Sequence, residues 1–239
     1  MEQTRGLSRD TIKYVAILAM LLDHIAWYLL EFSSPWAQAF HLVGRVTAPV
    51  MCFFLAQGYV YTRSVPRYLG RLLLFATLSQ IPWYLLHQGK SWLTFNFLFT
   101  LAFSLLAIHA WETIGSTPLR LLAVAACVAA SYYCDWHFYA PLWCLLFYVF
   151  REDRAKQLFS FCGVALLYME ETVRGRLNAG FSVNTSLRTS AFTLGVFLAI
   201  PLLLSYNNRK GRFGWSKWIF YWFYPAHLAV LAILQRILK

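Results

Sequence analysis

Long apolar stretches alternate with short polar segments along almost the whole chain. Several stretches approach the length of about 20 residues that an α-helix needs to cross a bilayer. Because lipid offers the backbone no hydrogen-bond partners, such stretches are expected to be helical. The pattern predicts about nine membrane-spanning helices, at residues 12–30, 40–61, 72–87, 94–111, 119–134, 138–150, 157–170, 189–206 and 218–236. The expected fold class is therefore all-α, a polytopic integral membrane protein with a polar central cavity, in a single domain over residues 1–239.

Composition excludes a soluble protein. Of the 239 residues 59% are hydrophobic and only 13% are charged, whereas an average soluble domain has a charged fraction of about 25%. The longest polar stretch, residues 170–188, is too short for a soluble domain. It is expected to form a loop on the outer face of the membrane.

The net charge of +11 has a membrane explanation rather than a nucleic-acid one, because the basic residues are spread among short loops. A cytoplasmic N-terminus places most of the 21 lysines and arginines on the cytoplasmic side, as the positive-inside rule requires. The sequence thus predicts a multi-pass protein whose surroundings are a lipid bilayer, with no nucleic-acid partner.

The five cysteines fall within or at the edges of apolar segments and form no CxxC pair, so they are interpreted as small packing residues. No spacing of histidine and carboxylate residues indicates a metal site.

Asp23 and His24 lie side by side about two-thirds of the way along the first apolar stretch. Ionisable residues at that depth are expensive in lipid and indicate a functional site by default. Arg45, deep in the second stretch, is the expected partner of Asp23. Since adjacent helical residues point about 100° apart, His24 is expected to face the polar interior instead. The alternative for His24 is a packed histidine that makes one hydrogen bond.

Lys13 precedes His24 by 11 residues, which is three helical turns and about 16 Å on nearly one face. Arg9 lies close to the same face. Such a stripe would let a phosphate-bearing ligand bind at the cytoplasmic end and extend a reactive arm toward His24. The alternative is that Lys13 only snorkels to the interface.

His41 and Arg45 share a face of the second stretch, where Gly44, Ala48 and Pro49 permit close helix approach and local distortion. A structural ion pair with Asp23 and direct contact with a substrate carbonyl or phosphate remain alternative roles for Arg45.

His227 lies near the middle of the last stretch, close to a backbone carbonyl that Pro225 frees from helical hydrogen bonding. A second intramembrane histidine favours a polar cavity shared between helices, although a packed histidine bonded to that carbonyl is the alternative. Interhelical hydrogen bonding is the expected role of the weaker polar candidates Asn96, Thr100, Gln57 and Gln80.

At these residues the chain resembles the TraX family, the membrane acetylases of conjugative F-type pilin. The resemblance rests on residues 9–24 (RDTIKYVAILAMLLDH), 44–49 (GRVTAP), 96–100 (NFLFT), 151–155 (REDRA) and 223–231 (FYPAHLAVL). These segments occur in order and extend over nearly the whole chain. TraX is grouped with transmembrane acyltransferases, which often carry a basic residue, ten further residues and then a histidine in the first span; Lys13 and His24 fit that spacing.

The resemblance implies an acetyl-CoA-dependent acetyltransferase of the bacterial inner membrane. It implies that His24 is catalytic, that Asp23, Arg45 and His227 belong to the site, and that Lys13 or Arg9 helps to bind CoA, with Arg63 and Arg67 as further candidates. The expected acceptor is the N-terminal amino group of a pilin-like peptide. O-acetylation of a glycan or lipid, and a small proton-coupled transporter, are the alternative functions. No metal is expected.

Overall fold

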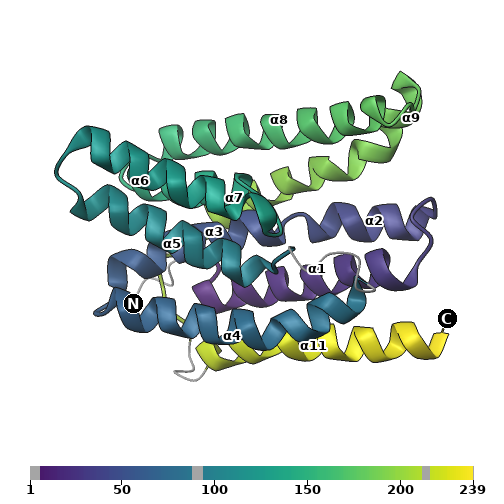
Figure 1. The fold of residues 1–239 in the computed structure, drawn as a ribbon, viewed down its shortest axis with the longest axis horizontal. Helices are drawn as coiled ribbons and strands as arrows, with labels where there is room; N and C mark the ends of the chain where they lie inside the picture. Colours follow the sequence, from purple (N-terminus) through teal and green to yellow (C-terminus); the bar gives the residue numbers. More distant parts are fainter. Residues whose placement is uncertain (1–5, 88–93, 212–215, 239) are drawn as a thin grey trace. The chain divides into compact units, whose positions relative to one another are not determined.

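The computed structural model describes residues 6–87, 94–211 and 216–238, and within them the chain is helical, with no strand (Figure 1). The elements are α1 (Arg9–Leu29), α2 (Pro35–Gly44), α3 (Thr47–Tyr61), α4 (Val65–Leu86), α5 (Phe97–Thr113), α6 (Thr117–Ala130), the 3-10 helix η1 (Ser131–Tyr133), α7 (Tyr139–Val149), α8 (Arg154–Asn178), α9 (Val183–Ser190), the 3-10 helix η2 (Ala191–Leu198), α10 (Ala199–Leu204) and α11 (Ser216–Leu238). The prediction of an all-α fold is confirmed.

Several of these helices have the dimensions of membrane spans. In the described part of the chain, five helical stretches are long and apolar enough to cross a membrane: Arg9–Leu29, Pro35–Tyr61, Val65–Leu86, Val183–Leu204 and Trp218–Leu238. Three shorter apolar helices cover Phe97–Thr113, Thr117–Tyr133 and Tyr139–Val149. These helices support the prediction of a membrane protein, and the number of nine crossings stays a prediction.

The polar stretch 170–188 is largely helical, so the prediction of a loop there is wrong. Helix α8 continues to Asn178 and α9 begins at Val183. Within α8, Arg174 pairs with Glu170 at 3.0 Å, one turn away, and such pairs support a helix whose surface is polar. Hydropathy detects only apolar helices, which explains why this one was missed.

Asp153 caps the start of α8, because its Oδ1 accepts a hydrogen bond from the backbone N–H of Lys156 at 3.0 Å. This hydrogen bond, with the Lys156 ammonium 3.1 Å away, lowers the pKa of Asp153 from its usual value. A lowered folded-state pKa stabilises the protein above the unfolded pKa of about 4, and the effect is lost as the pH falls through the folded value.

We therefore expect Asp153→Ala to lower the melting temperature at pH 7. The change should be small because the carboxylate is exposed, and the difference in melting temperature between the variant and wild type should narrow toward pH 3. Thermal melts in detergent measure this. Glu152→Ala is the control, since Glu152 is exposed and makes only a 3.5 Å contact with Arg151. Equal effects of the two substitutions would exclude the capping role.

The chain divides into two compact units. Unit 1 contains Met1–Met51, Cys162–Phe223 and Ile233–Lys239, and unit 2 contains Cys52–Phe161 and Tyr224–Ala232. The prediction of a single domain over residues 1–239 stays a prediction.

In unit 1, α1 and α2 run side by side (Figure 1). Ser34 caps α2 by accepting from the N–H of Ala37 at 3.1 Å, with Pro35 in the first turn. The predicted second span is interrupted after Gly44, and α3 begins only at Thr47. Pro49 explains the interruption, because a proline has no N–H and its ring collides with the carbonyl four residues earlier, here that of Arg45.

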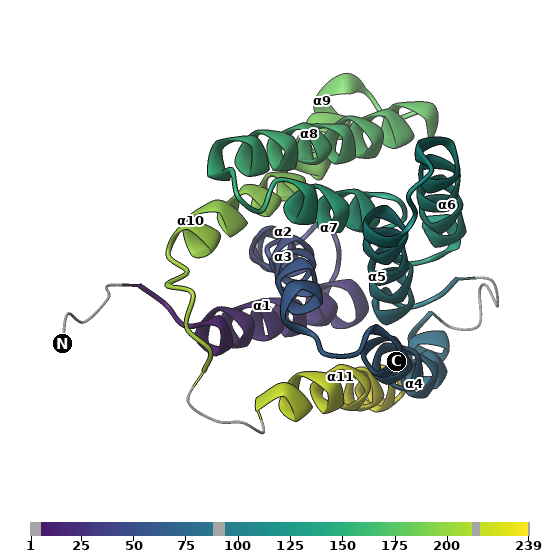
Figure 2. The same cartoon turned by 90° about the vertical axis from the view of Figure 1, so that its left-hand side faces the viewer.

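In unit 2, α5 packs against α4, α6 and α7 (Figure 2). Asn96 caps α5 and also joins it to α4, donating from Nδ2 to the Ala76 carbonyl and to Gln80 Oε1, both at 2.8 Å. Thr100 donates to the carbonyl of Asp135 at 2.6 Å. The predicted bonding of Asn96 and Gln80 between helices is confirmed.

Candidate functional site

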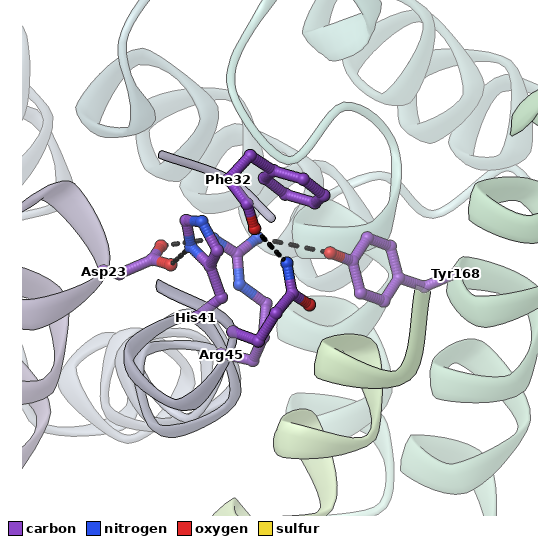
Figure 3. A network of polar contacts seen from close by, with 6 residues as sticks. Asp23, Phe32, His41, Arg45 and Tyr168 are labelled. Atoms are coloured by element: carbon purple, nitrogen blue, oxygen red, sulfur yellow. Dashed lines mark hydrogen bonds and ion pairs between the residues drawn. The ribbon is translucent and has the colours of Figure 1, made fainter. Parts of the chain in front are cut away.

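Asp23 is the centre of a buried polar network in unit 1. Its Oδ1 lies 2.8 Å from Nδ1 of His41, and its Oδ2 accepts from Nη2 of Arg45. Figure 3 shows both side chains directed at the carboxylate. The relative exposures are 7% for Asp23, 0% for His41 and 8% for Arg45. The predicted pairing of Asp23 with Arg45 is confirmed.

Gly44 allows the two helices that carry these residues to approach closely. A Cβ at this position would lie 2.2 Å from Cβ and 2.7 Å from Cγ of Asp23, closer than atoms can pack. His41 is in the last turn of α2, and Arg45 directly follows the helix. Because glycine has no side chain, α2 can approach α1 closely at Gly44, and His41 and Arg45 can reach Asp23.

Arg45 connects α1 with two further elements of unit 1. Its Nη1 donates to the hydroxyl of Tyr168 on α8 at 3.2 Å, as Figure 3 shows. Its guanidinium lies 5.5 Å from the ring centroid of Phe192 on η2. A buried arginine is tolerable when its charge is balanced and its N–H groups are bonded. Asp23 balances the charge, and the hydrogen bonds to Asp23 and Tyr168 engage both terminal nitrogens of the guanidinium.

Aromatic rings surround the imidazole of His41. The ring centroids of Trp27, Phe32 and Phe192 lie 4.4, 5.5 and 5.5 Å from that of His41. The carbonyl of Phe32 accepts from Nε2 of Gln38 at 2.7 Å, which holds Phe32 over the network (Figure 3). The cluster separates His41 from solvent.

The charge of Asp23 determines how His41 is protonated. Paired with Arg45, Asp23 is an ionised carboxylate and can only accept hydrogen bonds, so Nδ1 of His41 carries the hydrogen. In the neutral imidazole Nε2 then bears a lone pair. This atom is buried and has no hydrogen-bond partner among the residues that the structure describes. A base oriented by a carboxylate is the arrangement that activates nucleophiles in many enzymes.

The sequence places His41 on the same face as Arg45 without indicating a role for it, and nothing in the sequence indicates Tyr168. The four-residue spacing of His41 and Arg45 was the available signal. Tyr168 is 123 positions from Arg45, and no local pattern connects the two.

His24 is buried, with 8% exposure, and its ring lies 5.9 Å from that of Tyr28. The carboxylate oxygens of the adjacent Asp23 are directed to His41 and Arg45 instead, as expected for neighbouring residues of a helix. The catalytic role of His24 stays a prediction.

His227 belongs to unit 2, where it is buried with 6% exposure and its ring lies 5.5 Å from that of Tyr224. Asp23 and Arg45 belong to unit 1. The predicted cavity shared by His227 with these residues therefore stays a prediction.

The four predicted CoA-binding cations fall in different units. In unit 1, Arg9 pairs with Asp10 at 3.0 Å, and Nζ of Lys13 lies 4.5 Å from the ring centroid of Phe220. Arg63 and Arg67 are exposed in unit 2. Asp10, which was not predicted as a partner of Arg9, is 5% exposed. An anionic ligand bound by Arg9 would have to compete with its carboxylate. Across the described residues no group of three or more His, Cys, Asp or Glu side chains is placed to hold a metal.

An all-helical chain with several potential membrane spans and a buried carboxylate–imidazole–guanidinium network defines a class, the helical membrane proteins with a polar interior site. The family model described as TraX protein matches residues 8–235, and the chain belongs to this family. It is 32% identical to the probable fimbrial assembly protein FimC, serogroup H1, of Dichelobacter nodosus, over 100% of both chains. It is also 30% identical to an uncharacterised protein of Rickettsia prowazekii (strain Madrid E), over 41% of this chain and 36% of the relative. No solved structure matches the chain.

Proposed function

We propose that the protein is a membrane-bound acetyltransferase that moves an acetyl group from acetyl-CoA to the N-terminal amino group of a pilin-like peptide. Membership of the TraX family and the fimbrial assembly name of the Dichelobacter nodosus relative support a pilus-related acceptor. The proposal includes a place in the bacterial inner membrane with the N-terminus in the cytoplasm.

The observation that carries the proposal is the buried network of Asp23, His41 and Arg45 directly beside His24. Three ionisable groups within apolar helices are costly in a membrane, and such groups usually mark a functional site. Histidine suits proton transfer near neutral pH, and acetylation of an amine requires proton transfer.

The reaction assigns a role to each group. The neutral amine nitrogen attacks the thioester carbonyl carbon, the C–N bond forms, and the carbonyl electron pair moves onto oxygen. Arg45, or the Tyr168 hydroxyl that it holds, stabilises this oxyanion. His24 accepts a proton from the nitrogen. The C–S bond then breaks, sulfur keeps the electron pair and takes the proton from His24, and the products are the acetamide and CoA thiol.

Arg9 and Lys13 would hold the phosphates of CoA. They lie one turn apart near the start of α1, and Lys13 is about 16 Å along the helix axis from His24. A ligand bound there would extend along α1 to bring its thioester to His24.

We expect His24→Ala to lower acetyl transfer by about 10²- to 10⁴-fold, the usual value of general acid–base catalysis, while binding of acetyl-CoA is retained. The measurement is incubation of proteoliposomes with isotopically labelled acetyl-CoA and a pilin-like peptide, followed by mass spectrometry, with calorimetry for acetyl-CoA binding. His137→Asn is the matched control, because His137 is exposed in unit 2. Undiminished transfer by folded His24→Ala would exclude the catalytic role. Label in a glycan or lipid instead of the peptide would contradict the proposed acceptor.

A further inference from the structure

We propose that His41 is a second proton acceptor of the site, which deprotonates the incoming ammonium group of the acceptor through Nε2. The inference rests on the proposed acetyl transfer to an amine. It assigns to His41 a step separate from that of His24.

The hydrogen-bond geometry makes Nε2 of His41 a base. Asp23 accepts from Nδ1 at 2.8 Å and therefore holds the hydrogen on that nitrogen. The same carboxylate also accepts from Arg45 through its other oxygen. In the neutral imidazole with this tautomer, the lone pair is on Nε2.

The surroundings of Nε2 fit a cationic partner. This atom is buried in a side chain that is 0% exposed, and no described residue bonds to it. Most buried polar atoms in proteins are paired, and an exception calls for an explanation. An ammonium group of the acceptor, bound beside the imidazole, would supply the donor for Nε2 of His41. The rings of Trp27, Phe32 and Phe192 enclose the imidazole, and aromatic faces attract ammonium groups.

The site lies closer to the end of α1 that is opposite Arg9. Asp23 is six residues, about 9 Å, from Leu29, where α1 ends, and 14 residues, about 21 Å, from Arg9. Phe32, which is only half-buried, follows in the segment between α1 and α2. A movement of Phe32 would open a path to His41 from this side, away from the cations expected to bind CoA.

The proton balance of the reaction leaves one proton for an acceptor other than His24. An α-amino group has a pKa of about 7.7–8.0 and arrives mainly as R–NH3+ at neutral pH. It loses two protons on the way to the amide. One passes through His24 to the sulfur of CoA, and the other must leave before the nitrogen can attack. His41 takes that first proton and later releases it to solvent, so that R–NH3+ and acetyl-CoA give the acetamide, CoA thiol and H+.

The test is the pH dependence of acetyl transfer by His41→Asn in proteoliposomes. The amide of asparagine retains a donor toward Asp23 but has no base in the place of Nε2. Without His41 only the neutral amine reacts, and its fraction falls about tenfold per pH unit below its pKa. The ratio of wild-type to variant rate should therefore be close to one at pH 9 and should rise as the pH falls to 6, to at most about 60-fold, the inverse of the neutral fraction of the amine at that pH. The charged and titratable groups around His41 are Asp23 and its neighbour His24 on α1, Arg45 at the end of α2, and Tyr168 on α8; Arg176 of α8 lies 5.0 Å over Phe32. All are unchanged in the variant.

Two outcomes would contradict the role of His41 without contradicting the proposed function. One is unchanged acetyl transfer by His41→Asn at every pH. The other is an equal loss of transfer at pH 6 and pH 9, which a purely structural role of His41 would give. An inactive wild-type protein would instead contradict the proposed function. Should His41→Asn fail to fold, nitrogen NMR of wild type with labelled histidine decides. Hydrogen on Nδ1 and a bare Nε2 are expected for His41, and a hydrogen on Nε2 would exclude it as the acceptor.

Discussion

Asp23→Ala is expected to destabilise the protein by about 3–5 kcal/mol, the usual result of removing one partner from a buried ion pair. The substitution withdraws the carboxylate from Arg45 and from Nδ1 of His41 at once. Arg45 has 8% exposure and His41 has none, so water cannot replace the lost oxygens. Thermal unfolding in detergent and the yield of folded protein from membranes measure the effect.

A double variant separates stability from function. In Asp23→Leu with Arg45→Met the buried charges are replaced together by apolar side chains, which is often neutral for stability. We expect the double variant to regain most of the stability that Asp23→Ala loses, and to have no acetyl transfer, because the residues of the proposed site are gone. A loss below about 1 kcal/mol in Asp23→Ala would place the pair among exposed ion pairs, which contribute little, and would contradict its burial.

Gly195→Ala is expected to cost about 3 kcal/mol or more, at the upper end of the range for overpacking. A Cβ at Gly195 would lie 1.7 Å from the carbonyl oxygen and 2.6 Å from the carbonyl carbon of Leu42. Backbone atoms cannot rotate away as a side chain can, so η2 and α2 must separate. Because Leu42 adjoins His41, and Phe192 packs on both His41 and Arg45, we expect acetyl transfer to fall as well.

The control for this prediction is Gly175→Ala in α8 of the same unit. No atom lies within 4 Å of the position that a Cβ at Gly175 would occupy. Replacing glycine with alanine inside a helix usually stabilises the folded state by about 0.5–1 kcal/mol. The melting temperature of Gly175→Ala should therefore equal or exceed that of wild type. Equal stability of the two variants would show that η2 does not pack against α2 as closely as described.

Local composition was sufficient to predict the class of the protein, because the ability of a helix to enter a bilayer depends mainly on its own 20 or so residues. The break in the second span also has a local cause, the ring of Pro49. Residues 170–188 were misassigned because a polar helix has no hydropathy signal. Glu170 and Arg174 can pair only when the segment is helical, so their spacing alone does not indicate the helix.

Part of the candidate site could also be predicted from the sequence. Asp23 and Arg45 were expected to pair, since each is the opposite charge available in the neighbouring span and a lone charge is costly in an apolar helix. The sequence could not predict which histidine binds Asp23. His24 is adjacent in sequence and His41 is 18 positions away.

By itself, then, the sequence determined that this chain is all-helical, suited to a membrane, related to TraX and furnished with an Asp23–Arg45 pair. Only the tertiary structure decided that His41 completes the pair, that Tyr168 and Phe192 hold Arg45, and that aromatic rings enclose the base. The physical reason is that hydropathy and helical period are properties of one segment. The partner of a carboxylate depends on the rotation and distance of one helix against another, and here the contact of Gly44 with Asp23 sets both.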